Sequence, residues 1–460
     1  MKKYINEAVK KVSRNISFST PGHKGIFSLP SQVEFDVTET IGTDNLLHPQ
    51  DAILKSMENL KRIYGSKKSY YLTGGSTISN HIALKSITKE GDRVLIERNA
   101  HRSILNGCIL NKLKTEFMYP SYDKKTKLFL PLSPQIIESY LKKYKDIKLV
   151  ILTSPTYYGM VLNIREIAGV VHKYGADLLV DEAHGAHFNF LDKNLSALSG
   201  GADIIVQSPH KTLPCLTGSS FIHVGSSKVN IERLEKVISM ISSTSPSYLM
   251  LLSMERALEY MEEEGRENLK NVLNLIKELK NDLKDKYFFY ESDFHDPTKL
   301  LFAKENVSGS QILRELFKKN IRLEMADINY ALALVGPVDS EKTLVPLKKA
   351  MREINLKEEN FKDLYRQVLP EKIMEMYETF ERESQFINYT EAAGRISADT
   401  ICPYPPGSPI IVPGELIDQD VIDTIGTYLK AEIEVTGINK NLIEVIKWHL
   451  KKIFPKKMKT

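Results

Sequence analysis

The chain has 460 residues, of which 42% are hydrophobic and 26% charged, so it is long enough for two or three domains with a large core. Its formal net charge of +5 is small for this length, and three scattered cysteines, Cys108, Cys215 and Cys402, exclude a disulfide scaffold. No run approaches about 18 apolar residues and the N-terminus lacks the apolar core of a signal peptide, so we expect a cytoplasmic protein. The basic last residues, KKIFPKKMKT, could touch nucleic acid or acidic lipid, but such a tail is more often a solvated helix end, so we expect neither partner.

The first segments of the chain are short and separated by turns. Residues 1–15 carry charges throughout and are expected to form a short amphipathic helix. Residues 17–25 (SFSTPGHKG) predict a loop with a histidine and a lysine at its tip. Residues 52–64 have helical spacing and end at Gly65, which is typical of a helix C-terminus.

Small and hydroxyl-bearing residues mark the start of the next expected helix. The sequence LTGGST ends at Thr77, and residues 78–87 have a helical pattern. Gly75, Ser76 and Thr77 therefore lie at a helix N-terminus, where backbone amides and hydroxyls can bind an anion such as a phosphate. An ordinary N-cap is the alternative, because serine and threonine favour that position in any helix.

Two apolar runs further along are expected to be buried strands. Residues 93–97 (RVLIE) are followed by His101, and residues 148–153 (KLVILT) are followed by SPTYYG. The imidazole of His101 can lie flat on an aromatic cofactor. A lone histidine after a strand is, however, more often a hydrogen-bonded structural residue.

The expected strand at residues 177–180 leads into Asp181 and the sequence DEAHGAH. VDEAH also resembles the magnesium-binding strand of nucleotide-driven helicases, but those proteins need a phosphate loop, G-x-x-x-x-G-K-[ST], and the chain contains no Gly-Lys dipeptide. His184 and His187 offer a metal site as a minor alternative. No matching ligand cluster occurs elsewhere in the sequence, so we expect no metal.

The apolar run at residues 202–206 (ADIIV) brings Ser208, His210 and Lys211 to the carboxyl end of a strand, where open α/β sheets bind ligands. A buried amine is costly unless it is paired or neutralised, and a covalent link to the aldehyde of pyridoxal 5′-phosphate (PLP) makes use of it. PLP needs a carboxylate against its pyridine nitrogen, and Asp181 has the right position and type. A solvated loop lysine is the alternative interpretation of Lys211.

Strands and helical patterns alternate through the first half of the chain. Strands are expected at 93–97, 148–153, 177–181, 202–206 and 219–224, with helices at 132–144 and 164–174 between them. This alternation predicts an α/β fold with a mostly parallel sheet and helices on both faces. The absence of G-x-G-x-x-G argues against a dinucleotide-binding version.

The second half of the chain is expected to form a long helical connector and a smaller C-terminal α+β domain. Residues 230–286 are predicted to be helical with a break at 242–247, followed by strands at 299–303, 321–325 and 330–335 and helices at 311–319 and 341–354. A helical stretch at 358–387, a proline-rich segment at 402–415 and two closing helical segments complete the chain. We therefore expect an N-terminal arm and helix (1–60), a large PLP-binding domain (61–290) and a small C-terminal domain (291–460).

Each motif alone is ambiguous, but their order along the chain is specific. The sequence contains, in this order, STPGHKG, LTGGSTISN, ERNAHRS, LTSPTYYG, VDEAHGAHF, QSPHKTL and AGRISADTICPYPPGSPIIVPGE. From residue 17 to residue 415 the chain thereby resembles the bacterial ornithine/lysine/arginine decarboxylase family, which has PLP fold type I. Because the chain starts almost directly at the first motif, we expect the short form that lacks the extra N-terminal domain of large inducible members.

The resemblance implies a role for each matched residue. Lys211 matches the lysine that forms a Schiff base with PLP, Asp181 the partner of the pyridine nitrogen, and His101 the histidine that stacks on the ring. The implied cofactor-binding set also contains Gly75, Ser76, Thr77, His184, Ser208 and His210. Among these, Ser76, Thr77, Ser208 and His210 match the residues that contact the phosphate. Pro209 departs from the family, since many relatives have a small polar residue there. The family also implies a homodimer with active sites at the subunit interface.

The implied reaction is decarboxylation of arginine, lysine or ornithine. A fold type I aminotransferase is an alternative that uses the same lysine and aspartate and usually a further arginine, for which Arg395 is the candidate. A PLP-fold sensor without turnover is a second alternative, against which the complete motif set argues. The distal cation of the substrate needs an acidic partner, for which Glu324 and Glu415 are candidates.

Overall fold

The structure is a computed structural model that describes residues 15–28, 33–191, 195–358, 368–404, 407–431 and 433–447. The helix expected over residues 1–15 lies almost entirely outside these ranges. Two compact units are present: unit 1 comprises residues 1–107 and 116–363, and unit 2 comprises residues 108–115 and 364–460. The expected domain limits at residues 60 and 290 stay predictions.

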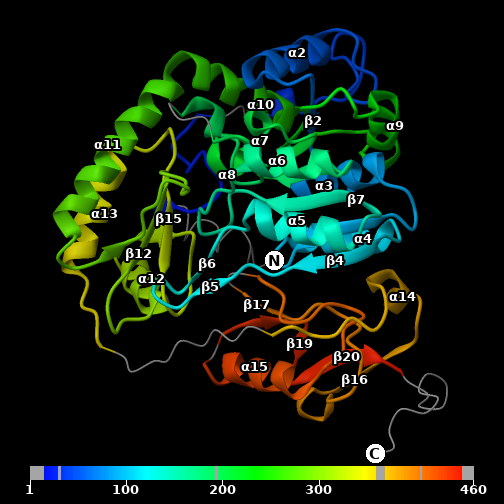
Figure 1. Cartoon of the computed structure of the whole chain (residues 1–460). Coiled ribbons are helices and arrows are strands. Elements are labelled where there is room, and N and C mark those ends of the chain that lie inside the picture. Colours follow the sequence, from blue (N-terminus) through cyan, green and yellow to red (C-terminus); the bar gives the residue numbers. More distant parts are fainter. Residues whose placement is uncertain are drawn as a thin grey trace, which may run out of the picture. The chain divides into compact units, whose positions relative to one another are not determined.

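Unit 1 is built on a seven-stranded sheet with the strand order β2-β10-β9-β8-β7-β3-β4 (Figure 1). β3, β7, β8 and β9 run parallel to one another, whereas β10 pairs antiparallel with β2 and with β9. The predicted mostly parallel sheet is therefore confirmed. The strands are β2 (Lys68–Leu72), β3 (Arg93–Glu97), β4 (Lys114–Met118), β7 (Ile147–Thr153), β8 (Asp177–Asp181), β9 (Ile204–Gln207) and β10 (Ser220–Val224).

Short, nearly continuous apolar runs form the central strands because helices cover both faces of the sheet. Val150 and Val180 pack with side chains of α5 (Pro134–Lys143) and α6 (Ile164–Lys173) in one core. Side chains alternate along a strand, so Asp181 points to the face opposite Val180. Asn80 of α3 (Gly75–Ile87) donates a hydrogen bond to Asp181, which places α3 on that second face.

Several helices of unit 1 begin at a capping side chain. Ser133 accepts the N–H of Ile136 at the start of α5, and Asn163 accepts that of Glu166 at the start of α6. The remaining helices of the sheet region are α2 (Ala52–Tyr64), α4 (Arg102–Leu110), α7 (Ala197–Gly200), α8 (Pro209–Thr212), α9 (Ile231–Ile241) and α10 (Tyr248–Tyr260). Short 3-10 turns occur at Val33–Phe35 and Phe188–Phe190, and a two-stranded ribbon pairs β5 (Tyr122–Asp123) with β6 (Leu128–Phe129).

The rest of unit 1 surrounds a second core that Phe18 shares with Phe302 and Leu347. A four-stranded antiparallel sheet with the order β11-β12-β15-β14 lies there, together with a parallel pair of β1 and β13. The strands are β1 (Ile16–Phe18), β11 (Phe288–Phe289), β12 (Lys299–Ala303), β13 (Ile321–Leu323), β14 (Met325–Ala326) and β15 (Ala331–Leu334). The helices are α11 (Arg266–Leu283), α12 (Gly309–Lys318) and α13 (Glu341–Glu353). A π turn at Met261–Gly265 joins α10 to α11.

Unit 2 has its own core, in which Ile411, Val421 and Val445 are buried. Its sheet has the order β16-β20-β19, and β17 pairs with β18. The elements are α14 (Met376–Phe380), β16 (Ser384–Asn388), a 3-10 turn (Tyr389–Glu391), β17 (Cys402–Pro403), α15 (Gln419–Lys430), β18 (Val435–Thr436), β19 (Ile438–Asn439) and β20 (Leu442–Ile446).

One expectation about this last part is wrong. Of the stretch expected to be helical at 358–387, residues 359–367 lie outside the described ranges, and the remainder contains only the short α14 before the strand β16. The cause is that polar residues with helical propensity also occupy the exposed faces of small antiparallel sheets. Of the two closing helical segments, the structure has α15, and residues 448–460 lie outside the described ranges. Within the described residues, no helix is long and apolar enough to cross a membrane.

Candidate active site

Lys211 lies on the short helix α8, directly after β9 ends at Gln207. Its backbone N–H donates to the carbonyl of Ser208 at 2.9 Å. Its side-chain Nζ lies 3.1 Å from Nε2 of His184. Burial lowers the pKa of Lys211, and the negative charges of Asp181 and Glu324 oppose that shift.

His184 is buried beside this amine and follows β8 by three residues. Burial lowers the pKa of His184 well below its ordinary value, and the charge of Lys211 adds to the effect, so the imidazole is neutral and its Nε2 shares a hydrogen bond with Nζ. The ring of Tyr157 meets it edge to face, with centroids 5.1 Å apart. Among the described residues, Nδ1 of His184 has no hydrogen-bond partner.

Asp181 is the last residue of β8 and is 2% exposed. Its Oδ1 accepts the backbone N–H of Ala183 at 3.1 Å, and its Oδ2 accepts Nδ2 of Asn80 at 2.9 Å. Both neighbours are donors. The carboxylate is therefore held as an acceptor close to Lys211, whose pKa it raises.

His101 follows β3, which β7 separates from β8 in the sheet. Desolvation lowers the pKa of His101, the charge of Asp181 opposes this shift, and the charge of Lys211 adds to it. Hydrogen bonds connect His101 to Asp181, because Oγ of Ser103 lies 2.8 Å from Nδ1 of His101 and Asn80 donates both to this Oγ and to Asp181. His101 is exposed, so its ring is accessible to a ligand.

The N-terminus of α3 lies at the same edge of the sheet. Gly75 begins the helix with φ +69°, a backbone conformation that favours glycine, and its N–H donates to the carbonyl of Gly218 at 2.7 Å. Ser76 and Thr77 occupy the first turn, where backbone amides have no acceptor within the helix. This turn is suited to an anion.

Buried hydroxyl groups between β9 and β10 add donors to this anion-binding turn. Ser208 and Ser219 are both 0% exposed, and within the described part of the chain their Oγ atoms have no hydrogen-bond partner. An unpaired buried hydroxyl is costly, so a ligand with acceptor oxygens fits here. His210 donates from Nδ1 to the carbonyl of Ser219 at 2.8 Å, and burial lowers its pKa to about 4.

The loop at residues 17–25 packs against the turn that carries Lys211. The N–H of Gly22 donates to the carbonyl of His210 at 2.6 Å. A Cβ atom on Gly22 would lie 2.5 Å from the carbonyl oxygen of Leu213, which is closer than van der Waals contact allows. Glycine is therefore required for this close approach.

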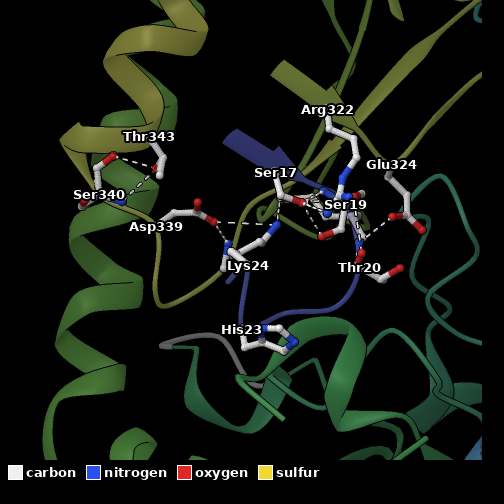
Figure 2. A network of polar contacts seen from close by, with 12 residues as sticks. Ser17, Ser19, Thr20, His23, Lys24, Arg322, Glu324, Asp339, Ser340 and Thr343 are labelled. Carbon is white, nitrogen blue, oxygen red and sulfur yellow. Dashed lines mark hydrogen bonds and ion pairs between the residues drawn. The ribbon is translucent and has the colours of Figure 1, made fainter. Parts of the chain in front are cut away.

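Lys24 holds the same loop on the second core of unit 1 (Figure 2). Its side chain is 2% exposed, and Nζ donates to the carbonyl of Leu334 at 2.6 Å and lies 3.9 Å from Oδ2 of Asp339. Burial lowers the pKa of Lys24, although Asp339 opposes the shift.

Glu324 contacts the same loop at Thr20 (Figure 2). Its Oε2 accepts the N–H of Thr20 at 2.7 Å, and its Oε1 accepts the hydroxyl of Tyr157 at 2.8 Å. Because Tyr157 also contacts His184, a continuous set of contacts runs from the loop to Lys211. The other two candidate residues, Glu415 and Arg395, lie in unit 2, where Glu415 accepts the N–H of Val412 and Arg395 donates to the carbonyl of Ile446.

Sequence reasoning missed two buried residues near this site, Asn80 and Lys299. Asn80 lies four residues after Ser76, so both occupy one face of α3, and this spacing is a signal that was present in the sequence. Lys299 opens the apolar strand β12, is 1% exposed and donates to the carbonyl of Tyr157 at 2.9 Å. Burial lowers the pKa of Lys299 to about 8. Among the described residues, no group of three or more His, Cys, Asp or Glu side chains is arranged to hold a metal ion.

Two solved structures share the fold of this chain. The Francisella novicida lysine decarboxylase LdcF has a TM-score of 0.79 at 18% identity over 96% of this chain and 83% of its own. The serine palmitoyltransferase of Sphingomonas wittichii has a TM-score of 0.58 at 16% identity over 73% of this chain and 86% of its own. With a lysine, a carboxylate and an anion-binding turn at one edge of a mostly parallel sheet, the chain has the α/β architecture of PLP fold type I.

Sequence comparison gives the family. Residues 5–311 match the model of the Orn/Lys/Arg decarboxylase major domain, and residues 314–438 match that of the C-terminal domain. The chain therefore belongs to the Orn/Lys/Arg decarboxylase family, which comprises PLP-dependent decarboxylases of basic amino acids. It is 31% identical to an arginine decarboxylase of Bacillus anthracis over 93% of both chains, and 33% identical to the uncharacterized protein YaaO of Bacillus subtilis over 92% of both.

Proposed function

We propose that the chain decarboxylates L-arginine to agmatine and carbon dioxide, with PLP bound at Lys211. Support for arginine comes from relatives matched over nearly their whole length, since the arginine decarboxylases of Bacillus anthracis and Bacillus subtilis are 31% and 28% identical over 93% and 96% of their chains. The constitutive lysine decarboxylase of Escherichia coli is 23% identical over 74% of its chain. The observation that carries the chemistry is the contact of the Lys211 amine with neutral His184 beside Asp181.

The residues at the sheet edge fit PLP. The anion-binding turn at Gly75, with Ser76, Thr77, Ser208 and His210, is proposed to hold the phosphate, and His101 to cover the ring. When bound, PLP supplies an electron-accepting ring that takes up the electron pair left by departing carbon dioxide. Asp181 is proposed to keep the pyridine nitrogen protonated, since a buried carboxylate favours a positive charge next to it.

Lys211 and His184 are proposed to manage the proton of the reaction. Loss of carbon dioxide breaks the bond between the α-carbon and the carboxylate, and the α-carbon then takes one proton to give the amine. A neutral imidazole 3.1 Å from a lysine amine can exchange a proton with it. The pair thereby offers a donor that does not depend on bulk water.

The charge around the site favours a cationic substrate. The negative charge of Glu324 opposes the lowering of the pKa that burial causes at Lys211, Lys299 and Lys24. A guanidinium group held away from water needs such a partner. We propose Glu324 as that partner, and a homodimer as the active form.

A product assay tests the reaction. Purified protein is incubated with PLP and with arginine, lysine or ornithine in parallel, each with and without 2-oxoglutarate. We expect carbon dioxide and agmatine from arginine at a rate at least about tenfold above the rates with the other two, because a pocket that pairs a buried guanidinium disfavours shorter amines. Formation of glutamate that depends on 2-oxoglutarate, without carbon dioxide from any substrate, would establish an aminotransferase instead.

Borohydride reduction of the PLP-loaded protein tests the lysine assignment. We expect the reduced cofactor on the peptide that contains Lys211, and its loss in Lys211→Ala, because this amine lies beside the anion-binding turn. Lys299→Met is the matched control, since Lys299 is also buried and its pKa is lowered to about 8. Cofactor on the Lys299 peptide would contradict the assignment.

A further inference from the structure

Asp181 ends β8 and His101 follows β3, and these two strands are not neighbours because β7 runs between them. Their relative position is therefore not set by strand pairing alone. Asn80 of α3 lies between them and is 0% exposed. One of its side-chain hydrogen bonds goes to Oδ2 of Asp181 at 2.9 Å and the other to Oγ of Ser103 at 2.9 Å.

Ser103 carries this connection to His101. Its Oγ lies 2.8 Å from Nδ1 of His101, and its backbone N–H donates to the same nitrogen at 3.2 Å. A ring nitrogen that accepts from a backbone N–H carries no proton, so the Ser103 hydroxyl also donates to it. The ring proton of neutral His101 is therefore on Nε2.

The direction of the Asn80 amide is determined by its neighbours. The two hydrogens of Nδ2 face two acceptors, the carboxylate of Asp181 and the lone pair of the Ser103 hydroxyl. The reverse orientation would bring Oδ1 against the carboxylate, which is repulsive. In the described structure Oδ1 of Asn80 has no hydrogen-bond partner, so the residue is buried at a cost that an apolar side chain would avoid.

We propose that Asn80 is a positioning residue that fixes the Asp181 carboxylate and, through Ser103, the His101 ring as one unit. Its two donors orient the Asp181 carboxylate directly and the His101 imidazole through Ser103, so Asn80 would act on a bound cofactor only through these two side chains. The catalytic part of the proposal depends on the proposed decarboxylation. The orientation of His101 is a property of the chain alone and is measured without cofactor.

The test compares Asn80→Ala and Ser103→Ala with Ser86→Ala as the matched control. Ser86 lies on the same helix, is 3% exposed and donates to the carbonyl of Ala83, so its loss removes a buried hydrogen bond outside this set. For Asn80→Ala we expect kcat with arginine to fall at least about tenfold with KM nearly unchanged, because misplaced groups slow the reaction more than they weaken binding. Ser103→Ala should give a smaller loss and Ser86→Ala none.

The second readout is the ¹⁵N spectrum of labelled histidine in cofactor-free protein. The signals of His101 among the 11 histidines are assigned by their loss in His101→Gln. The wild type should show the proton on Nε2, and both Asn80→Ala and Ser103→Ala should shift the Nδ1 signal while Ser86→Ala does not.

The outcomes separate the two proposals. A folded Asn80→Ala protein with unchanged kcat and an unchanged His101 signal would refute the positioning role. If Asn80→Ala does not fold, Ser103→Ala decides by the same criteria. If the wild type decarboxylates none of the three amino acids, the proposed function fails, and the histidine signals alone support or refute the role of Asn80.

Discussion

Gly22 determines how closely the N-terminal loop approaches Lys211. The position of a Cβ atom on Gly22 is 2.5 Å from the carbonyl oxygen of Leu213, and that atom belongs to backbone that cannot rotate away. The loop is also fixed at Lys24, through Leu334 and Asp339. A change at Gly22 must therefore displace the turn of α8 and not the loop alone.

We predict that Gly22→Ala lowers the free energy of unfolding by about 1–3 kcal/mol and weakens PLP binding, because overpacking shifts the backbone that carries His210 and Lys211. Gly169→Ala is the control, since Gly169 lies in α6 with no atom within 4 Å of its Cβ position. That change should stabilise the chain by about 0.5–1 kcal/mol. Thermal unfolding measures the stability of each variant, and titration with PLP measures its affinity for the cofactor. If Gly22→Ala has the stability and the PLP affinity of the wild type, the close contact with Leu213 is refuted.

A buried polar set crosses three neighbouring strands of the central sheet. Nε2 of Gln207 on β9 donates to the carboxyl group of Glu182 at 2.6 Å. Oε1 of Gln207 lies 3.1 Å from Nε2 of His223 on β10. Nδ1 of His223 in turn lies 2.7 Å from Oγ of Ser69 on β2. His223 and Ser69 are direct partners in the strand register. Burial raises the pKa of Glu182 to about 8 and lowers the pKa of His223 to about 3, so both side chains are uncharged in the folded protein near pH 6.

These pKa shifts predict that stability falls in both directions from about pH 6, with an alkaline arm caused by Glu182 and an acid arm caused by His223. Between pH 4.5 and about 8, folded Glu182 keeps a proton that the unfolded chain has lost, so stability falls as pH rises. Between pH 6.5 and about 3, the unfolded chain protonates His223 while the folded chain does not, so stability falls as pH decreases. Each shift corresponds to about 1.4 kcal/mol per pKa unit.

Thermal unfolding of cofactor-free protein between pH 4 and pH 8 measures these arms. We expect Glu182→Gln to flatten the alkaline arm and His223→Gln to flatten the acid arm, whatever each change does to stability at pH 6. An unaltered slope in either variant would show that the corresponding side chain is charged in the folded state.

A groove on unit 1 bears on the proposed homodimer. Its volume is about 600 Å³, and charged and apolar side chains line it, the latter including Leu46, Met57, Tyr70 and Met240. Met240 is 69% exposed, whereas the other three are buried. Apolar side chains that line an exposed groove are typical of surfaces that bind a partner. A second copy of the chain is the partner that the family implies.

We predict that the PLP-loaded protein sediments at twice its 52.3 kDa mass and that Met240→Asp weakens the dimer by about 1–2 kcal/mol. Val345→Asp is the control, because Val345 is 52% exposed on α13 and does not line the groove. A monomer at micromolar concentration in analytical ultracentrifugation would contradict the homodimer. If Met240→Asp and Val345→Asp weaken the dimer equally, the groove is not part of the dimer interface.

The sequence by itself predicted five of the seven strands of the central sheet of unit 1 and its class of fold, but not the edge strands β2 and β4. Short β-branched runs such as Ile147–Thr153 have one low-energy state, a strand covered on both faces, and the predicted strand at 148–153 and helix at 164–174 agree with β7 and α6 to within a residue. The edge strand β4 (Lys114–Met118) was missed, because its sequence KTEFM is too polar to mark a buried strand.

Tertiary structure alone decided which side chains meet at the sheet edge. Asn80 reaches Asp181 across 101 residues of sequence, and Glu324 reaches Thr20 across 304. Such contacts depend on the order of strands in the sheet and on the face to which each side chain points, and neither is encoded in a local pattern. Motif order identified the residues Lys211, Asp181 and His101, whereas the hydrogen bonds that orient them arise only when distant segments pack together.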